Sequence, residues 1–264
     1  MNGISKIQEA IAGARILGGK ISMVTGAGAG IGEACVRLFA DQGAKVIAVD
    51  IDGERLGRVC SDVNECGGEM IAVRADVTES ADLERAFRRA AKAFGPLDVL
   101  VNNAGGGLPT DFFAINQDEW NRVVHLNLTS VFMASQRAAA IFRDRRSGCI
   151  INMSSLAGRS VSVTAGAHYT AGKAGMLGLN RHLAKTLAPY NVRVNAVCPG
   201  VVNSERLIKR MAENGTTEEV ARGVPLGRIG DVSEVASACL FLASDLASYI
   251  TGASLDVNGG AAML

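Results

Sequence analysis

Seven short apolar runs alternate with longer segments of helical periodicity along this chain of 264 residues. Most of the runs are apolar at every position, as expected for strands that are covered on both faces. The segments between them carry apolar residues three or four positions apart, which is the spacing of one face of a helix. Repeated strand–helix units form parallel sheets with right-handed crossovers. The pattern therefore predicts an α/β fold, a Rossmann-type doubly wound parallel sheet with helices on both faces.

The elements can be located from these patterns. We predict strands at Lys20–Thr25, Lys45–Asp50, Met70–Arg74, Asp98–Asn102, Gly148–Ser154, Val192–Cys198 and Ser254–Val257. We predict helices at about Gly30–Gln42, Gly53–Cys66, Glu79–Phe94, Asp118–Arg143, Ala167–Leu187 and Val232–Leu242. Because no repeat, low-complexity stretch or linker interrupts the alternation, residues 1–264 are expected to form a single domain.

Composition excludes several classes of function. The net charge is +1 with both signs interspersed, so no basic stripe suggests a nucleic-acid partner. No apolar run reaches the roughly 18 residues of a membrane helix. The six cysteines form no C-x-x-C pair, and the three histidines share no metal-ligand spacing. We therefore expect no metal site, and reduced, buried cysteines in a cytoplasmic protein.

Residues 1–18 precede the first strand and form an N-terminal extension. Apolar residues recur there at helical spacing, but Lys6, Glu9 and Arg15 interrupt any signal-peptide core. An amphipathic targeting sequence is an open alternative. We favour a short helix that packs on the domain or on a partner subunit.

A glycine-rich turn directly follows the first strand. It reads Gly26-Ala-Gly28-Ala-Gly30-Ile31-Gly32 and leads into a helical pattern. A strand, a glycine turn and a helix bring backbone N–H groups and a helix N-terminus up to a diphosphate, and a Cβ would hold the chain away from it. The spacing differs from G-x-G-x-x-G because Ile31 stands where the last glycine would be. The turn predicts a dinucleotide site.

Asp50 ends the second strand, eighteen residues beyond Gly32. An acid about twenty residues past the glycine turn accepts hydrogen bonds from an adenosine ribose, and its charge repels a 2′-phosphate. No Lys or Arg follows directly, since Ile51 and Asp52 come next. The sequence therefore favours NAD(H) over NADP(H). Helix capping is the alternative role for Asp50, although Asp52 and Gly53 fit that role better.

Tyr169 and Lys173 lie four residues apart in a predicted helix, so both project from one face. A neighbouring ammonium favours the ionised form of a phenol, which suits Tyr169 for proton transfer. His168 is adjacent, but neighbouring helical residues point about a third of a turn apart, so we expect no catalytic role for it.

The glycine turn and the Tyr169–Lys173 pair, in this order, resemble the short-chain dehydrogenase/reductase family. The resemblance runs from about Lys20 to Gly260. Further matching segments are Asp76-Val77, Asn102-Asn103-Ala104-Gly105, Trp120 leading to Asn127, Cys198-Pro199-Gly200 and Asp256-Val-Asn-Gly-Gly260. The family implies the strand order 3-2-1-4-5-6-7 and a homotetramer, with the helices Asp118–Arg143 and Ala167–Leu187 paired across one two-fold axis.

The resemblance also implies roles at the reacting centre. Tyr169 would donate a proton to a carbonyl oxygen or accept one from an alcohol. Lys173 would lower the pKa of Tyr169 and hydrogen-bond the nicotinamide ribose. Asn127 would position a water that leads from Lys173 to solvent. A serine hydroxyl would hold the substrate oxygen.

The position of that serine needs a choice. Family members usually carry it thirteen residues before the tyrosine, and Leu156 stands there in this chain. Of Ser154 and Ser155 we choose Ser155, because Leu-Ala-Gly follows it as in family members. A second departure from the family is Gly172, where Ser or Ala is more usual.

The remaining cofactor contacts follow from the matched segments. Asp76 and Val77 would meet the adenine, although Asp76 could instead start a turn with Thr78 as the cap of the next helix. Ser204 would bond the nicotinamide carboxamide. The implied cofactor-binding residues are Gly26, Gly28, Gly30, Ile31, Gly32, Asp50, Ile51, Asp76, Val77, Asn103, Ala104, Gly105, Tyr169, Lys173, Pro199, Gly200, Val202 and Ser204.

The chain is thus expected to be an NAD-dependent oxidoreductase that interconverts a secondary alcohol and its ketone. The alternatives are a 3-oxoacyl thioester reductase and a non-catalytic dinucleotide-binding sensor. Glu205–Arg222 would form a lid over a largely apolar substrate of small or medium size. Arg159 could meet an anionic substrate, but a solvated loop charge is the interpretation we favour.

Overall fold

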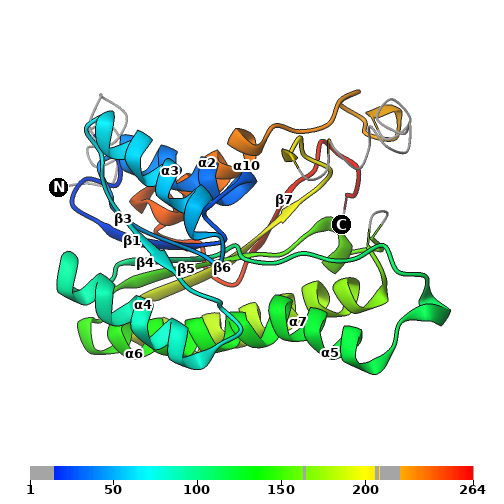
Figure 1. The fold of residues 1–264 in the computed structure, drawn as a ribbon, viewed down its shortest axis with the longest axis horizontal. Helices are drawn as coiled ribbons and strands as arrows, with labels where there is room; N and C mark the ends of the chain where they lie inside the picture. The colour runs from blue at the N-terminus through cyan, green and yellow to red at the C-terminus, as the bar shows by residue number, and fades with distance from the viewer. Residues whose placement is uncertain (1–14, 163–164, 206–207, 209–220, 264) are drawn as a thin grey trace.

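A computed structural model of the protein describes residues 15–162, 165–205, 208 and 221–263. Seven parallel strands form one sheet in the order β3-β2-β1-β4-β5-β6-β7 (Figure 1), which confirms the predicted fold class and strand order. The strands are β1 (Ile21–Thr25), β2 (Lys45–Asp50), β3 (Glu69–Arg74), β4 (Val99–Asn102), β5 (Gly148–Met153), β6 (Val192–Pro199) and β7 (Ser254–Val257).

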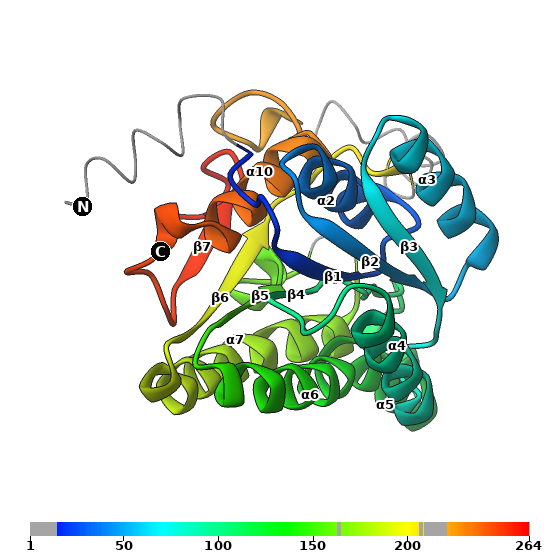
Figure 2. The ribbon, with the colours of Figure 1, turned by 90° about the vertical axis from the view of Figure 1, so that its left-hand side faces the viewer.

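Helices cover both faces of this sheet (Figure 2). On one face lie α2 (Gly30–Asp41), α3 (Gly53–Glu65) and α10 (Val232–Ala243). On the other lie α4 (Ser80–Ala93), α5 (Gln117–Val124), α6 (Ser130–Arg145) and α7 (Ala167–Leu187). Each layer has its own buried core against the sheet, with Phe39 of α2 and Phe142 of α6 fully buried. Burial of such a side chain stabilises the fold by about 1.5–3 kcal/mol.

The strand order places a switch point between β1 and β4. From β1 the chain crosses to β2 and β3 on one side, and from β3 it returns to β4 on the other. Ligands of open α/β sheets bind at the carboxyl ends of the strands beside such a point. The glycine turn after β1 and the Asn102–Gly107 segment after β4 therefore meet there.

The predicted single helix Asp118–Arg143 is interrupted in the structure. Between α5 and α6 lies η2, a π-helical turn at His125–Thr129. The Nδ2 group of Asn127 donates to the Val123 carbonyl (2.8 Å), so a side chain enters the backbone ladder of the helix. The turn packs on α7, where a Cβ on Gly172 would lie 3.1 Å from the Cβ of Asn127. This close approach explains a glycine at that position of α7.

Several local predictions can also be judged. Asp52 caps α3 by accepting from the backbone N–H groups of Glu54 and Arg55, as expected. The expectation that Thr78 caps the next helix is wrong, because α4 begins at Ser80 without a side-chain cap. Thr78 instead bonds Asp76, which does start a turn.

The cysteine prediction holds for four of the six. Cys35, Cys149, Cys198 and Cys239 are buried, whereas Cys60 is half-buried and Cys66, at the end of α3, is exposed.

Within the described residues no group of side chains could hold a metal ion. None of the described helices is long and apolar enough to cross a membrane. Most of the proposed N-terminal helix and of the 205–222 lid lies outside the described residues.

Candidate active site

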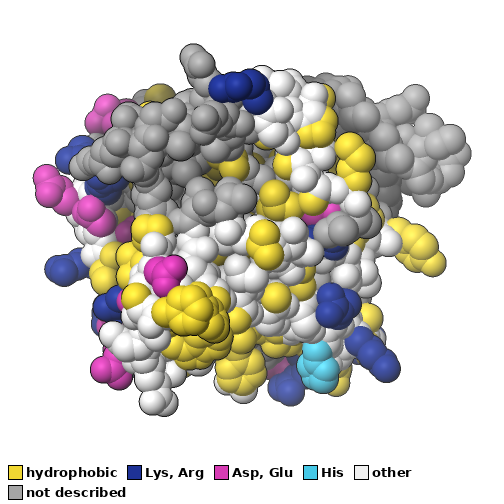
Figure 3. Space-filling view, turned by 90° about the vertical axis from the view of Figure 1, so that its right-hand side faces the viewer, with side chains coloured by type: hydrophobic (Ala, Val, Ile, Leu, Met, Phe, Trp, Pro, Cys, Tyr) yellow, Lys and Arg dark blue, Asp and Glu magenta, His cyan; other side chains and the backbone are white. Residues whose placement is uncertain are grey.

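A cleft of about 800 Å³ opens at the carboxyl ends of the strands. Figure 3 shows this side of the molecule, where apolar side chains gather on the surface. All but three of the predicted site residues line the cleft. The exceptions are Gly28, Gly32 and Asn127. Each of these three contacts a lining residue: Gly28 bonds Asp50, Gly32 packs against Gly26, and Asn127 bonds Gly106.

The glycine turn leaves backbone donors for a ligand. Ala29, the cap residue of α2, makes no side-chain hydrogen bond to the first turn of that helix, and Gly30 and Ile31 line the cleft. Uncapped N–H groups at a helix start suit a diphosphate. The turn itself is tightly packed, since a Cβ on Gly26 would lie 2.8 Å from the Cα of Ala104. These residues therefore fit a dinucleotide.

The side chain of Asn103 holds the turn in place. Its Nδ2 group donates to the carbonyls of Thr25 (2.9 Å) and Gly26 (3.0 Å), and its backbone N–H donates to the Thr25 hydroxyl (3.0 Å). Behind it, the buried Asn102 bonds Ser135 and Asn152. Asn103 thus braces the backbone of the turn, and Asn102 joins two neighbouring buried side chains.

Asp50 is held rigidly at the edge of the cleft. Its Oδ2 accepts from the Gly28 N–H (2.8 Å) and its Oδ1 accepts from the Asp52 N–H (2.9 Å). A Cβ on Gly28 would lie only 3.1 Å from the Asp50 carboxylate, which explains that glycine. A carboxylate oxygen has a second lone pair, so both oxygens can still accept from a ribose.

Sequence reasoning missed a cation beside Asp50. Arg55, one turn into α3, lines the cleft and donates to Oε2 of Glu205 (2.9 Å). Its Nε also lies 3.5 Å from Asp52. The two carboxylates draw the guanidinium toward themselves. The spacing gave only a weak signal, because Arg55 lies five residues beyond Asp50 and Glu205 is distant in sequence.

Beyond the end of β3, Asp76 lines the cleft and accepts from the backbone N–H (2.9 Å) and the hydroxyl (2.6 Å) of Thr78. Val77 beside it is nearly buried, and Leu126 of the π turn forms part of the same lining. Leu126 was not predicted, although it directly precedes Asn127 in the matched segment.

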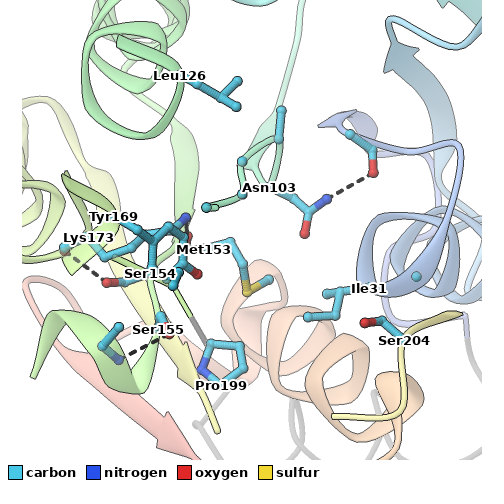
Figure 4. Close-up of a pocket in the computed structure, with 18 of the residues that line it drawn as sticks. Ile31, Asn103, Leu126, Met153, Ser154, Ser155, Tyr169, Lys173, Pro199 and Ser204 are labelled. Atoms are coloured by element: carbon cyan, nitrogen blue, oxygen red, sulfur yellow. Dashed lines mark hydrogen bonds between the residues drawn. The ribbon is translucent and has the colours of Figure 1, made fainter. Parts of the chain in front are cut away.

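Lys173 is buried beside Tyr169. Its Nζ donates to the Met153 carbonyl (2.6 Å) and lies 5.7 Å from the centre of the Tyr169 ring. Only 3% of Lys173 is exposed, and burial lowers its pKa to about 8. Below that pH an ammonium stands next to the phenol, which favours the phenolate. Figure 4 shows Tyr169 and Lys173 together on one side of the cleft, across from Ile31.

The two serines differ in their surroundings. Ser154 is buried, and its hydroxyl donates to the Lys173 carbonyl (3.0 Å). Ser155 caps a short 3-10 helix by accepting from the Ala157 N–H (3.1 Å). Its own hydroxyl proton is therefore left to donate toward the cleft. Both serines line the cleft, and the choice of Ser155 stays a prediction.

Asn127 lies behind the wall of the cleft and clamps Gly106. Its Oδ1 accepts from the Gly106 N–H (3.1 Å), and its Nδ2 donates to the Gly106 carbonyl (2.8 Å). A Cβ on Gly105 would lie 2.7 Å from Oδ1 of Asn127 and 3.1 Å from Nζ of Lys173. The glycines after β4 therefore let Asn127 and Lys173 approach the cleft wall.

One predicted charge has a different role. Arg159 forms an ion pair with Asp256 of β7 (3.0 Å), and both side chains are largely buried. The interpretation as a solvated loop charge is therefore wrong. The pair ties the loop after Ser155 to the last strand.

Comparison with known proteins places the chain in a family. The family model described as enoyl-(acyl carrier protein) reductase matches residues 26–262. The chain is 36% identical to a 3-oxoacyl-[acyl-carrier-protein] reductase of Thermotoga maritima, covering 92% of this chain and 98% of that one. It is 37% identical to the 2,3-dihydro-2,3-dihydroxybenzoate dehydrogenase of Bacillus subtilis, covering 93% and 97%.

A solved structure agrees with these sequence relationships. A short-chain type dehydrogenase/reductase from Mycobacterium marinum superposes with a TM-score of 0.90 at 30% identity, covering 95% of this chain and 98% of that one. Fold, site and relatives together define an oxidoreductase of the nicotinamide-dependent class. The chain belongs to the short-chain dehydrogenase/reductase family.

Proposed function

We propose that the protein interconverts a secondary alcohol and its ketone with NAD(H), using Tyr169 as general acid and base. The observation that carries this proposal is the buried ammonium of Lys173 beside Tyr169, at the carboxyl ends of the strands and across from the glycine turn. A dinucleotide site without catalytic activity would not require a buried charged lysine, because burial of a charge is costly. This argues against a non-catalytic sensor.

Each side chain has a defined task in this proposal. The nicotinamide, when bound, would supply or accept the hydride. Tyr169 takes the hydroxyl proton during oxidation and returns it during reduction, and Lys173 stabilises its phenolate below pH 8. Ser155 donates to the substrate oxygen and keeps it within reach of Tyr169. By resemblance, Asn127 keeps the water that resupplies the proton from solvent.

Asp50 supports NAD(H) as the cofactor. Its oxygens are fixed by Gly28 and Asp52, so little side-chain entropy is lost when a ribose binds. A 2′-phosphate would instead meet a fixed negative charge. Arg55 could offset this charge, but Glu205 and Asp52 already engage it.

A 3-oxoacyl thioester reductase is the second candidate. The name of the Thermotoga maritima relative supports it, and so does an apolar surface in the loop after β4. Phe112 and Phe113 there are 69% and 93% exposed. Such a surface suits an acyl chain better than a small polar alcohol.

The test is a panel of secondary alcohols with NAD⁺ and of ketones and 3-oxoacyl thioesters with NADH and NADPH, read by absorbance of the reduced cofactor. Tyr169→Phe is the matched variant, because it keeps shape and cofactor binding but removes the transferable proton. We expect it to lose most turnover. Near-normal turnover of this variant, or inertness of the wild type despite tight NAD binding, would contradict the proposal.

We also propose a homotetramer in the cytoplasm. The exposed side chains of Trp120 (39%) on α5 and Phe132 (45%) on α6 support a partner on that face, and the free cysteines suit a reducing compartment. Sedimentation at micromolar concentration measures the assembly, and a monomer would contradict it.

A further inference from the structure

His168 directly precedes Tyr169, yet its side chain is fully buried and is not part of the cleft lining. It stands in the first turn of α7, whose N–H groups have no partner within the helix. The cap residue of α7 is Gly166, which has no side chain to accept from them. A helix that carries Tyr169 in its first turn thus begins without the usual cap.

His168 supplies a side-chain acceptor at this end of the helix. The backbone N–H of Tyr169 donates to Nδ1 of His168 (2.8 Å) as well as to the Gly166 carbonyl (3.1 Å). The other ring nitrogen, Nε2, lies 2.8 Å from Oε1 of Glu119 on α5. The hydroxyl of Thr110, in the loop after β4, donates to the same oxygen. One chain of hydrogen bonds therefore joins that loop, α5, and the backbone of Tyr169.

The contacts define the protonation of the ring. A ring nitrogen that accepts from an N–H carries no proton, so Nδ1 is unprotonated. The ring proton then lies on Nε2, which donates it to Glu119. The hydrogen bonds from Thr110 and then from His168 lower the pKa of Glu119, which keeps it an anionic acceptor. Arg122 on α5 is a positively charged group that also acts on this carboxylate. The partners of the two ring nitrogens thus select one tautomer of His168.

Glycines around this hydrogen-bond network allow its members to pack closely, with no room for a Cβ. A Cβ on Gly166 would lie 3.0 Å from Cε1 of His168 and 2.8 Å from the Thr110 carbonyl. On the cleft side of the helix, a Cβ on Gly107 would lie 2.8 Å from the Cβ of Tyr169. Tyr169 is therefore confined between the loop after β4 and its own capped backbone.

We propose that His168 is a positioning residue for Tyr169. Its Nδ1 fixes the first turn of α7, and Nε2 ties that turn through Glu119 and Thr110 to the loop that borders the substrate. The inference rests on the proposed role of Tyr169 as acid and base. A displacement of about 1 Å at a reacting group costs on the order of a hundredfold in rate, so loss of the cap is expected to reduce turnover.

Two substitutions test the contacts of the two His168 ring nitrogens separately. His168→Asn places an amide oxygen close to Nδ1 and removes the contact with Glu119. His168→Gln places an amide nitrogen close to Nε2 and removes the ring acceptor, so the Tyr169 N–H keeps only the Gly166 carbonyl as its partner. His182→Gln, on the exposed side of the same helix, is the matched control.

The assay is kcat and its pH profile on the best substrate from the panel, with melting temperature and NADH binding measured in parallel. We expect His168→Gln to lower kcat about tenfold or more and to move the apparent pKa of turnover upward, because the phenol shifts away from Lys173. His168→Asn should keep most of kcat and the wild-type profile. Equal losses in both variants that follow the melting temperature, with unmoved profiles, would overturn the inference.

Tyr169→Phe in the same assay separates this inference from the proposed function. If that variant keeps turnover, the role of Tyr169 fails and the positioning role fails with it. If Tyr169→Phe is inactive while His168→Gln matches the wild type in kcat and pH profile, the proposed function stands and the positioning role alone is refuted.

Discussion

Replacement of Lys173 by Met should remove turnover and yet leave the protein at neutral pH as stable as its parent or up to about 2 kcal/mol more stable. Methionine is a straight apolar side chain of similar length, so it fills the space that the lysine stem occupies. What disappears is a buried positive charge. Because burial is the first cause of the lowered pKa, the cost of this charge does not depend on the Tyr169 phenol.

The size of the effect follows from the pKa. The ordinary value of 10.5 falls to about 8 in the folded protein, so the unfolded chain binds more protons between these two values. The stability of the wild type therefore rises with pH across that window, and burial of the charge costs about 3 kcal/mol at pH 7 but only about 1 kcal/mol at pH 9.5. Against this, Lys173→Met leaves the Met153 carbonyl without its partner, which costs about 1–3 kcal/mol at any pH.

The decisive quantity is the change with pH, because the loss at the Met153 carbonyl is constant. Urea unfolding at pH 7 and pH 9.5, at equal protein concentration and with reductant, gives the difference between Lys173→Met and its parent. The Tyr169→Phe background removes the phenol from the titration. We expect the advantage of the Met variant to shrink by about 2 kcal/mol from pH 7 to pH 9.5. A difference that stays constant would refute the argument that Lys173 is buried with its charge.

Three further predictions concern the cleft. Ser155→Ala should lower kcat about a hundredfold and Ser154→Ala should lower it much less; the reverse order in steady-state kinetics would show that the wrong serine was chosen. The wild type should prefer NAD(H) over NADP(H) by about a hundredfold in kcat/KM, since repulsion by Asp50 of about 2.7 kcal/mol is two decades. Asp50→Ser with Ile51→Arg should shift that ratio toward NADP(H), and an unmoved ratio would remove Asp50 as the specificity residue. Alcohol oxidation should speed up with rising pH through the apparent pKa of the coupled Tyr169 site; a flat profile with chemistry rate-limiting would contradict this.

Local spacing was enough to predict the sheet, the glycine turn and the Tyr169–Lys173 pair. Each depends on residues close in sequence, where helix and strand periods fix which side chains share a face. Asp52 as the cap of α3 was predictable for the same reason.

Contacts between distant residues were not predictable in this way. The residues around Arg159 in the sequence do not indicate that its ion-pair partner is Asp256 of β7. The residues around Arg55 likewise do not indicate its pairing with Glu205. The π turn escaped prediction because its cause is the Asn127 side chain, and apolar periodicity does not report where a side chain enters the backbone ladder.

The π turn at His125–Thr129 has a consequence for how this chain can change in length. A π turn holds an extra residue compared with an α turn, so a one-residue deletion there would leave a continuous helix with no loss of backbone bonds. The helices on either side would keep their orientation, because about five residues of a π turn cover nearly the same angle and rise as about four residues of an α turn. Only the side chains inside the turn would change place. Asn127 would lose its position against Gly106, and Leu126 would lose its place in the cleft lining. The extra residue is thus dispensable for the helix, and what it shapes is the wall of the cleft.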